Sequence, residues 1–494
     1  MGSVPAATWL PRIGAIAVLL AGALLLRLQG IGDQGFWIDE HASVLMAGDG
    51  SSPSIARIRS DVHPPFYFGL LHYWMRAFGD SATAIRLLST VASIATVGFL
   101  YRLGHLLYGA RTAWMAGLVA ATSLLQIYYA QEARSYAWLM LFTVLSTDSL
   151  VRWRLTTRTR HAWLYGLWTV ALLYTHYFSL LFIASQAMYV VYACWVARGS
   201  GDDRRRFTGW LAAVVLAAIL FLPWSGIFLE QWSGVQRSFW IPAPTSLAWL
   251  EAPLSFLSWW GPWSGESRVP VAAIGLAFAG LFASIWFLGR FPWPQPPRPT
   301  SSPEGGMTRR ESTVLLVLWL AVPIGLGLQL SLFGIDVFSF RNSTVSACAA
   351  LLLGAAVASQ LGSPWARNLV LAALLAPSVA QMPRYYTEPH KDQWCEAAHF
   401  VESRFQPETD AFVFDAPFIR YPFLACSTLE GIATVPSAVP TDPGHPRIWL
   451  IRGYGGKDSQ SAERIRSRGY TTAERWQGVR VEVDLFDRRP RTSE

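Results

Sequence analysis

Two adjacent carboxylates stand early in the chain, in the stretch Gly35-Phe36-Trp37-Ile38-Asp39-Glu40-His41, which follows the first apolar run. On a helix, neighbouring side chains point about 100° apart, as the turn of ~3.6 residues dictates, so Asp39 and Glu40 would face different groups. One of them could act as a general base while the other orients a group or binds a metal. The plainer alternative is a helix cap or a surface ion pair.

Histidine, arginine and tyrosine recur in four later stretches. The members that could do chemistry are Asp61, His63, Tyr129, Glu132, Arg134, His176 and Arg341. A guanidinium is a bidentate phosphate ligand, so an arginine here could hold a phosphate, although an arginine at a span end can also simply extend toward the interface. Glu132 could pair with Arg134 or belong to the same site. A lone histidine such as His63 is more often structural.

The composition identifies the scaffold that must position these residues. The chain has 494 residues, of which 52% are hydrophobic and 15% are charged. Soluble domains carry about 25% charged residues, so an ordinary soluble enzyme is excluded, as are disorder, coiled coil and collagen. The sequence therefore predicts an α-helical polytopic membrane protein.

Eleven apolar runs are long enough to be read as spans. We expect them near 9–28, 87–107, 113–127, 136–151, 162–177, 178–196, 207–229, 269–288, 314–332, 344–358 and 365–380. The N-terminal run lacks a cleavage signal and is read as an uncleaved first span.

Arginine clusters set the expected orientation. Three loops are rich in arginine, near 152–160, 198–206 and 290–310, and alternating spans place all three on one side, which the positive-inside rule makes cytoplasmic. The N-terminus is then cytoplasmic and the tail after residue 381 lies outside, in a protein of the bacterial inner membrane. The candidate site residues gather on the outer face.

The first outer loop also contains a helix pattern. After Pro64-Pro65, which suits a helix start, apolar residues recur at helical spacing through Phe66, Leu70, Tyr73 and Trp74, while His72 occupies another face. The pattern predicts an amphipathic helix that lies in the membrane interface.

Residues 1–380 form the predicted transmembrane domain and residues 381–494 a small extracytoplasmic α/β domain. Residues 392–405 have helical periodicity, and residues 411–415, 447–451 and 479–485 resemble strands. Cys395 and Cys426 fall in this tail, and the sequence leaves open whether they form a disulfide.

The basic charge does not point to a nucleic acid. Residues 1–380 carry 25 Lys and Arg against 16 Asp and Glu, whereas residues 381–494 carry 15 against 16. The excess therefore belongs to the membrane part, where it serves as a topology signal.

Several motifs together resemble the membrane glycosyltransferases of the GT-C fold, in the branch of the protein O-mannosyltransferases and the lipid A aminoarabinose transferase. The resemblance covers most of residues 30–180 well and the later spans loosely. Its carriers are Trp37-Ile38-Asp39-Glu40, His63-Pro64-Pro65-Phe66-Tyr67, Phe78-Gly79-Asp80, Arg86-Leu87-Leu88-Ser89, Tyr129-Ala130-Gln131-Glu132-Ala133-Arg134-Ser135-Tyr136 and Tyr174-Thr175-His176-Tyr177.

The resemblance implies an inverting transfer of a sugar from a polyprenyl-phosphate donor to an acceptor on the non-cytoplasmic face. Asp39 would be the general base, and Glu40 would orient the site. The implied donor-phosphate ligands are Arg134, Arg341, His63 and Tyr129, with Asp61, Glu132 and His176 as acceptor or supporting residues. Membrane lipid and a glycan, lipid or protein acceptor would be its partners.

One departure from the family bears on a metal. Where the aminoarabinose transferase has an acidic residue and Lys before its Pro, this chain has Val62-His63. Glu40, Asp61 and His63 are the candidate ligands of a divalent cation. The alternative function is a transporter or flippase for lipid-linked sugars, which would share the cations and grooves but would need no base. A structural subunit of an envelope complex is a third interpretation.

Overall fold

The computed structural model of the chain describes residues 10–48, 50–196, 201–237, 244, 248–256, 307–335, 337–429, 445–453 and 460–488. The chain divides into two compact units. The helical unit consists of residues 1–29, 46–80 and 84–383, and the C-terminal unit of residues 30–45, 81–83 and 384–494. Each unit is described by itself.

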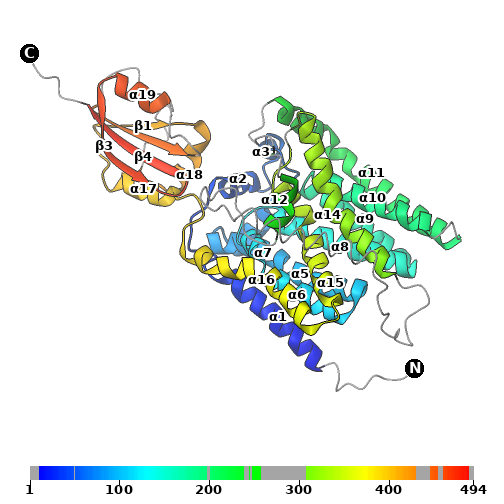
Figure 1. Cartoon of the computed structure of the whole chain (residues 1–494). Helices are drawn as coiled ribbons and strands as arrows, with labels where there is room; N and C mark the ends of the chain where they lie inside the picture. The colour runs from blue at the N-terminus through cyan, green and yellow to red at the C-terminus, as the bar shows by residue number, and fades with distance from the viewer. Residues whose placement is uncertain are drawn as a thin grey trace, which may run out of the picture. The chain divides into compact units, whose positions relative to one another are not determined.

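The helical unit combines long apolar helices with several short ones (Figure 1). Its helices are α1 (Leu10–Leu28), α3 (Ile55–Arg59), α4 (Phe66–Phe78), α5 (Ala82–Tyr108), α6 (Ala110–Thr122), α7 (Leu124–Ala130), α8 (Tyr136–Thr156), α9 (Thr159–Thr175), α10 (Ser179–Val196), α11 (Gly201–Arg237), α12 (Ala248–Ser255), α14 (Arg309–Leu332), η2 (Asn342–Ser346), α15 (Ala347–Gln360) and α16 (Pro364–Thr387).

A helix covers every expected span except 269–288, which lies outside the described residues. Among the described residues, five helices are long and apolar enough to cross a membrane, or six if one bent pair counts as a single span. The membrane-protein class is confirmed, whereas the count of eleven spans stays a prediction.

The bent pair is α6 and α7, whose axes differ by 56°. Ser123 caps α7 by accepting a hydrogen bond from the Gln126 N–H, and buried Arg27 donates to the carbonyls of Ala120 and Ala121 at 3.1 and 2.9 Å. The last carbonyls of a helix lack partners within it. A cation from α1 therefore satisfies the end of α6 and fixes the bend that leads into the Tyr129–Tyr136 segment.

The helix predicted after Pro65 exists as α4, while its place in the membrane interface stays a prediction. Tyr67, Phe68, Leu71 and His72 are buried, whereas Tyr73 is 63% exposed. His72 is held inside because its Nδ1 is 2.9 Å from the carbonyl of Ala47. An aromatic side chain that faces lipid follows the same periodicity as one that faces the core, so periodicity alone did not distinguish them.

The C-terminal unit contains a four-stranded sheet in the order β1-β2-β4-β3. The strands are β1 (Asp410–Phe414), β2 (Arg447–Gly453), β3 (Tyr470–Gln477) and β4 (Val481–Arg488). Strands β1 and β2 are parallel, and the other pairs are antiparallel. The sequence did not predict β3, because most residues of this edge strand are exposed and lack a regular alternation of apolar and polar side chains.

Helices cover both faces of the sheet. The first layer consists of α17 (Trp394–Glu402) and α18 (Arg420–Cys426), and α19 (Gln460–Ser467) packs on the opposite face (Figure 1). Cys395 and Cys426 form a disulfide between α17 and α18. The described part of this unit also contains the short helix η3 (Pro417–Ile419) and most of α2 (Ile38–Ala47), whose first turn carries Asp39 and Glu40.

Candidate functional site

A histidine lies between a carboxylate and a guanidinium in the helical unit. His63 Nδ1 is 2.8 Å from Asp61 Oδ2, and Arg134 Nη2 is 3.2 Å from His63 Nε2. A guanidinium only donates, so in the neutral ring Nε2 accepts from Arg134 and Nδ1–H donates to Asp61. Burial alone raises the pKa of Asp61, but His63 and Arg134 outweigh it and hold the pKa below its ordinary value.

His176 contributes a buried donor beside this histidine. Its ring packs edge-on against His63, with centroids 5.4 Å apart. Its Nδ1 accepts a hydrogen bond of 3.1 Å from the Phe178 N–H, which places the proton on Nε2. Among the described residues this Nε2 has no hydrogen-bond partner. An unsatisfied buried donor costs about 1–3 kcal/mol, and a ligand oxygen would satisfy it.

Two tyrosines extend the cluster toward a second arginine. Tyr136 packs against His176 with ring centroids 5.7 Å apart, and Tyr129 packs against Tyr136 at 4.8 Å. Tyr129 lies within electrostatic reach of Glu132 and Arg341. Glu132 is fully buried, and Arg341 and Arg134 are each 6% exposed. Charged groups are seldom buried in membrane proteins without a function or a partner.

Backbone contacts hold the Arg134 segment in place. Thr90 of α5 donates to the carbonyl of Ala130 at 2.9 Å, and Ser89 donates to that of Arg134 at 3.5 Å. The Gln131 amide donates to the carbonyl of Gln29 at 2.7 Å. The short bridge between α7 and α8 is therefore fixed on both sides, which sets the position of the guanidinium.

The loop that carries Asp61 and His63 is tied to α11. Gln231 donates from Nε2 to the carbonyl of Ile58 at 2.9 Å, and its Oε1 accepts a hydrogen bond from Tyr177. Trp224 Nε1 donates to the same tyrosine hydroxyl at 3.0 Å. These bonds link the first loop to the turn between α9 and α10, the segment that also supplies His176.

The helical unit thus brings together seven of the nine predicted site residues. They are Asp61, His63, Tyr129, Glu132, Arg134, His176 and Arg341. We call this set the polar cluster. The remaining two, Asp39 and Glu40, belong to the C-terminal unit.

Asp39 and Glu40 face different surroundings, as their adjacent positions on a helix predict. Asp39 is partly exposed, whereas Glu40 is fully buried, and its Oε1 is 2.8 Å from Lys391 Nζ. Asp392, the next residue along, accepts a hydrogen bond of 3.3 Å from the Ile38 N–H at the start of α2. Glu40 therefore joins α2 to the C-terminal residues, and Asp39 is the carboxylate that α2 leaves accessible.

The divalent-cation site expected at Glu40, Asp61 and His63 stays a prediction. Glu40 is paired with the ammonium group of Lys391. Among the described residues no three His, Cys, Asp or Glu side chains form a group that could hold a metal ion. We therefore derive no step through a metal.

Three charged residues that hold local structure were not predicted from the sequence: Arg27 in the helical unit, and Lys391 and Asp392 in the C-terminal unit. Arg27 lies inside an apolar run, where it looks like an isolated charge. An ionisable residue within a membrane span nevertheless indicates a buried partner or a functional role. Lys391 is one of only two lysines in the chain. The sequence shows that lysine is rare, but it does not show that the partner of Lys391 lies 351 positions earlier.

Comparison with known proteins places this geometry in context. Residues 62–227 match the family of dolichyl-phosphate-mannose-protein mannosyltransferases. The undecaprenyl phosphate-alpha-4-amino-4-deoxy-L-arabinose arabinosyl transferase of Pseudomonas aeruginosa (strain LESB58) is 24% identical over 303 residues. That alignment covers 49% of this chain and 53% of the relative, so the chain spans about half the length of the curated relative that it matches.

Two solved structures align with most of the chain. Apo ArnT from Cupriavidus metallidurans aligns with a TM-score of 0.58 at 12% identity, over 96% of this chain and 98% of its own. The oligosaccharyltransferase AglB from Archaeoglobus fulgidus, solved with an inhibitory peptide and a dolichol-phosphate, aligns with a TM-score of 0.53 at 12% identity, over 87% and 65%. The chain therefore shares the fold of these proteins, which confirms the predicted resemblance to the GT-C fold.

Proposed function

We propose that this chain is an integral membrane glycosyltransferase that moves a sugar from a polyprenyl-phosphate donor to an acceptor hydroxyl on the non-cytoplasmic face. The observation that carries the proposal is the polar cluster, in which buried Arg134, Arg341 and His176 Nε2–H gather between apolar helices. A lipid phosphate supplies what such a cluster requires, because it brings anionic oxygens and an apolar tail together.

The related proteins support this class of donor by their own names. The matched family is described by dolichyl-phosphate-mannose, and the curated relative by an undecaprenyl-phosphate-linked aminoarabinose. The sugars differ, while the polyprenyl phosphate is common to both. We therefore infer the donor class and leave the sugar open.

The polar cluster would bind and stabilise the leaving phosphate. When the bond between the anomeric carbon and the phosphate oxygen breaks, negative charge grows on that oxygen. Guanidinium groups such as Arg134 and Arg341, fixed beforehand in a dry site, stabilise this charge without reorganisation. His63 adds a ring held by Asp61, and Tyr129 adds a hydroxyl.

Asp39 would act as the general base. Its carboxylate takes the proton of the acceptor hydroxyl while the hydroxyl oxygen bonds to the anomeric carbon, and the polyprenyl phosphate departs from the opposite side with the electron pair of the broken bond. This in-line displacement inverts the anomeric centre. General-base catalysis contributes typically 10²–10⁴-fold. Glu40, neutralised by Lys391, supports α2 rather than exchanging protons with substrate.

The test separates donor binding from transfer. Purified full-length chain is given a labelled polyprenyl-phosphate sugar, and bound donor and transferred sugar are measured separately. We expect Asp39→Asn to lose transfer by about 10²–10⁴-fold with donor affinity unchanged. Asp33→Asn, which changes an exposed carboxylate of the same unit, is the matched control and should retain full transfer.

Other outcomes would reject specific parts of the proposal. Full transfer by Asp39→Asn would eliminate Asp39 as the base. Movement of the labelled lipid across liposome membranes, with no transfer in any acceptor extract, would favour a flippase. Unchanged donor affinity after both Arg134→Gln and Arg341→Gln would eliminate the polar cluster as the donor-phosphate site.

A further inference from the structure

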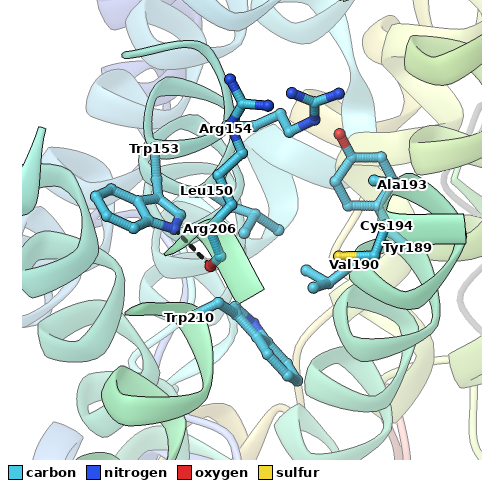
Figure 2. Close-up of a pocket in the computed structure, with 9 residues that line it drawn as sticks. All are labelled: Leu150, Trp153, Arg154, Tyr189, Val190, Ala193, Cys194, Arg206 and Trp210. Carbon is cyan, nitrogen blue, oxygen red and sulfur yellow. Dashed lines mark hydrogen bonds between the residues drawn. The ribbon is translucent and has the colours of Figure 1, made fainter. Parts of the chain in front are cut away.

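A small cavity in the helical unit shares no lining residue with the polar cluster. It is lined by α8, α10 and α11 through Leu150, Trp153, Arg154, Tyr189, Val190, Ala193, Cys194, Arg206 and Trp210 (Figure 2). No member of this cavity belongs to the polar cluster or to the expected outer loops. The proposed donor site therefore does not explain this cavity.

The cavity has two chemically distinct ends. Figure 2 shows the side chains of Arg154 and Arg206 reaching the same end, while the rings of Trp153 and Trp210 and the side chain of Val190 form the remaining wall. A small anion would gain little from the apolar wall, and a neutral apolar molecule would gain little from the guanidinium groups. An amphiphile with an anionic head matches both ends.

The cationic end is held by defined contacts. Arg154 Nε is 3.0 Å from Glu311 Oε1, which also accepts a hydrogen bond of 3.1 Å from the Tyr189 hydroxyl. Trp153 Nε1 donates to the backbone carbonyl of Arg206 at 3.0 Å. Because this bond uses the backbone, the side chain of Arg206 can be changed without removing the hydrogen bond that joins α8 to α11.

The surroundings of this end are strongly positive. Residues 152–160 and 204–206 together carry seven arginines, of which Arg152 and Arg154 are paired with Asp148 and Glu311. Membranes present anionic head groups at their surface, and each Lys or Arg near that surface contributes about 1 kcal/mol of attraction. The positive-inside rule assigns this end to the cytoplasmic leaflet, where such a lipid would approach laterally along the bundle.

We infer that an anionic phospholipid binds here, with its phosphate on Arg154 and Arg206 and no more than one methylene-sized group inside the cavity, against Trp153 and Trp210. The cavity volume is about 20 Å³, which is room for about one water-sized group. Only a narrow part of the lipid therefore enters. The rest would lie along the outer face of α10, where Val191 and Trp195 are 60% and 77% exposed.

The chain contains a reporter for this site. Cys194 lines the cavity as a partly buried thiol. Of the other three cysteines, Cys348 is fully buried and Cys395 and Cys426 share a disulfide. The rate at which N-ethylmaleimide alkylates Cys194, followed by peptide mass, therefore reports occupation of the cavity.

The experiment uses full-length protein in detergent with added phosphatidylglycerol, phosphatidylcholine or inorganic phosphate. We expect phosphatidylglycerol to slow alkylation of Cys194, with little effect of the other two. Arg206→Gln should weaken the protection by about fivefold, as the loss of one surface arginine predicts. Arg384→Gln, which changes an exposed arginine outside these two clusters, should leave it unchanged.

The proposal fails if phosphatidylcholine protects Cys194 as well as phosphatidylglycerol does, because the head-group charge would then be irrelevant. It also fails if inorganic phosphate alone protects, since the site would then take an anion without a lipid. Titrating the unsubstituted protein with each lipid and with inorganic phosphate decides both questions. The test therefore does not depend on the folding of a variant.

Discussion

Lys391 Nζ lies 2.8 Å from Glu40 Oε1, and both side chains are buried, with 5% and 0% exposed. The pair connects residues 351 positions apart and fastens α2 to the segment around residue 391, within the C-terminal unit. Two buried charges lose hydration, and each is tolerated because the other is present. The helix that carries Asp39 is thus held by residues far along the chain.

Removing one partner of this pair should be costly. Lys391→Met leaves the Glu40 carboxylate buried beside a thioether, and such losses typically destabilise by about 3–5 kcal/mol. We expect a corresponding fall in the thermal unfolding temperature of the C-terminal unit. The double variant Glu40→Gln with Lys391→Met should recover much of it, because no charge is then left unpaired.

The matched control is an exposed pair in the same unit. Arg384 and Glu388 lie 2.6 Å apart with 56% of each side chain exposed. Exposed pairs contribute about 0–1 kcal/mol, so Arg384→Met should change the unfolding temperature little. Equal decreases in unfolding temperature for Lys391→Met and Arg384→Met would show that the buried pair stabilises the unit no more than the exposed pair does.

Acid should destabilise α2 through His41. Burial lowers the pKa of His41 from 6.5 to about 4, against the opposing effects of the Glu40 and Asp392 carboxylates. Because the unfolded chain binds this proton more readily, stability is lost as the pH falls from 6.5 toward 4, by up to about 3 kcal/mol at about 1.4 kcal/mol per pKa unit. Above pH 6.5 the ring is neutral in both states.

This acid sensitivity can be assigned by substitution. His41→Gln should flatten the decline of the unfolding temperature between pH 6.5 and 4. His399→Gln, which changes an exposed histidine of the same unit, should leave the decline in place. Identical pH profiles for His41→Gln and the unsubstituted chain would contradict the assignment.

The positions of the helices could be predicted because each apolar run is continuous and local. The runs near 87–107, 178–196 and 314–332 correspond to α5, α10 and α14. The side of each helix that packs against the protein core could not be predicted, because an apolar side chain can contact either lipid or the core. On α4, for example, Tyr73 is exposed, whereas His72 is buried.

The residue types of the candidate site could be predicted more fully than its partners. The arginines, histidines and tyrosines of the polar cluster were all named from the sequence, since buried charge in an apolar chain is conspicuous. The pairing of Glu40 with Lys391 was not, because no local pattern encodes a contact across 351 positions. The predicted division at residue 381 likewise gave no sign that residues 30–45 group with the C-terminal unit.

The disulfide should stabilise the C-terminal unit. Cys395 and Cys426 are 31 positions apart, and a closed loop of that length typically contributes about 2–4 kcal/mol by restricting the unfolded chain. We expect the double variant Cys395→Ala with Cys426→Ala to unfold at a lower temperature and to be insensitive to dithiothreitol. Thiol counting in the denatured, unreduced chain should find two thiols, and a count of four would contradict the pairing.

The two nitrogens of His176 have separable tasks that two substitutions can distinguish. In the native ring Nδ1 accepts from the Phe178 N–H at 3.1 Å, and Nε2 is the buried donor without a partner among the described residues. An asparagine side chain can replace the Nδ1 contact but not the Nε2 donor, whereas a glutamine side chain reaches the Nε2 position and loses the Nδ1 contact.

If Nε2–H donates to the donor phosphate, His176→Asn should weaken polyprenyl-phosphate binding by about tenfold or more, the equivalent of 1.5–3 kcal/mol for a hydrogen bond to a charged group. Its unfolding temperature should change little. His176→Gln should retain most of the affinity while losing about 1 kcal/mol of stability with the Phe178 contact. Binding to labelled lipid and thermal unfolding measure the two quantities independently. Unchanged affinity in His176→Asn would mean that the buried donor serves the fold alone, because the ligand would then gain nothing from it.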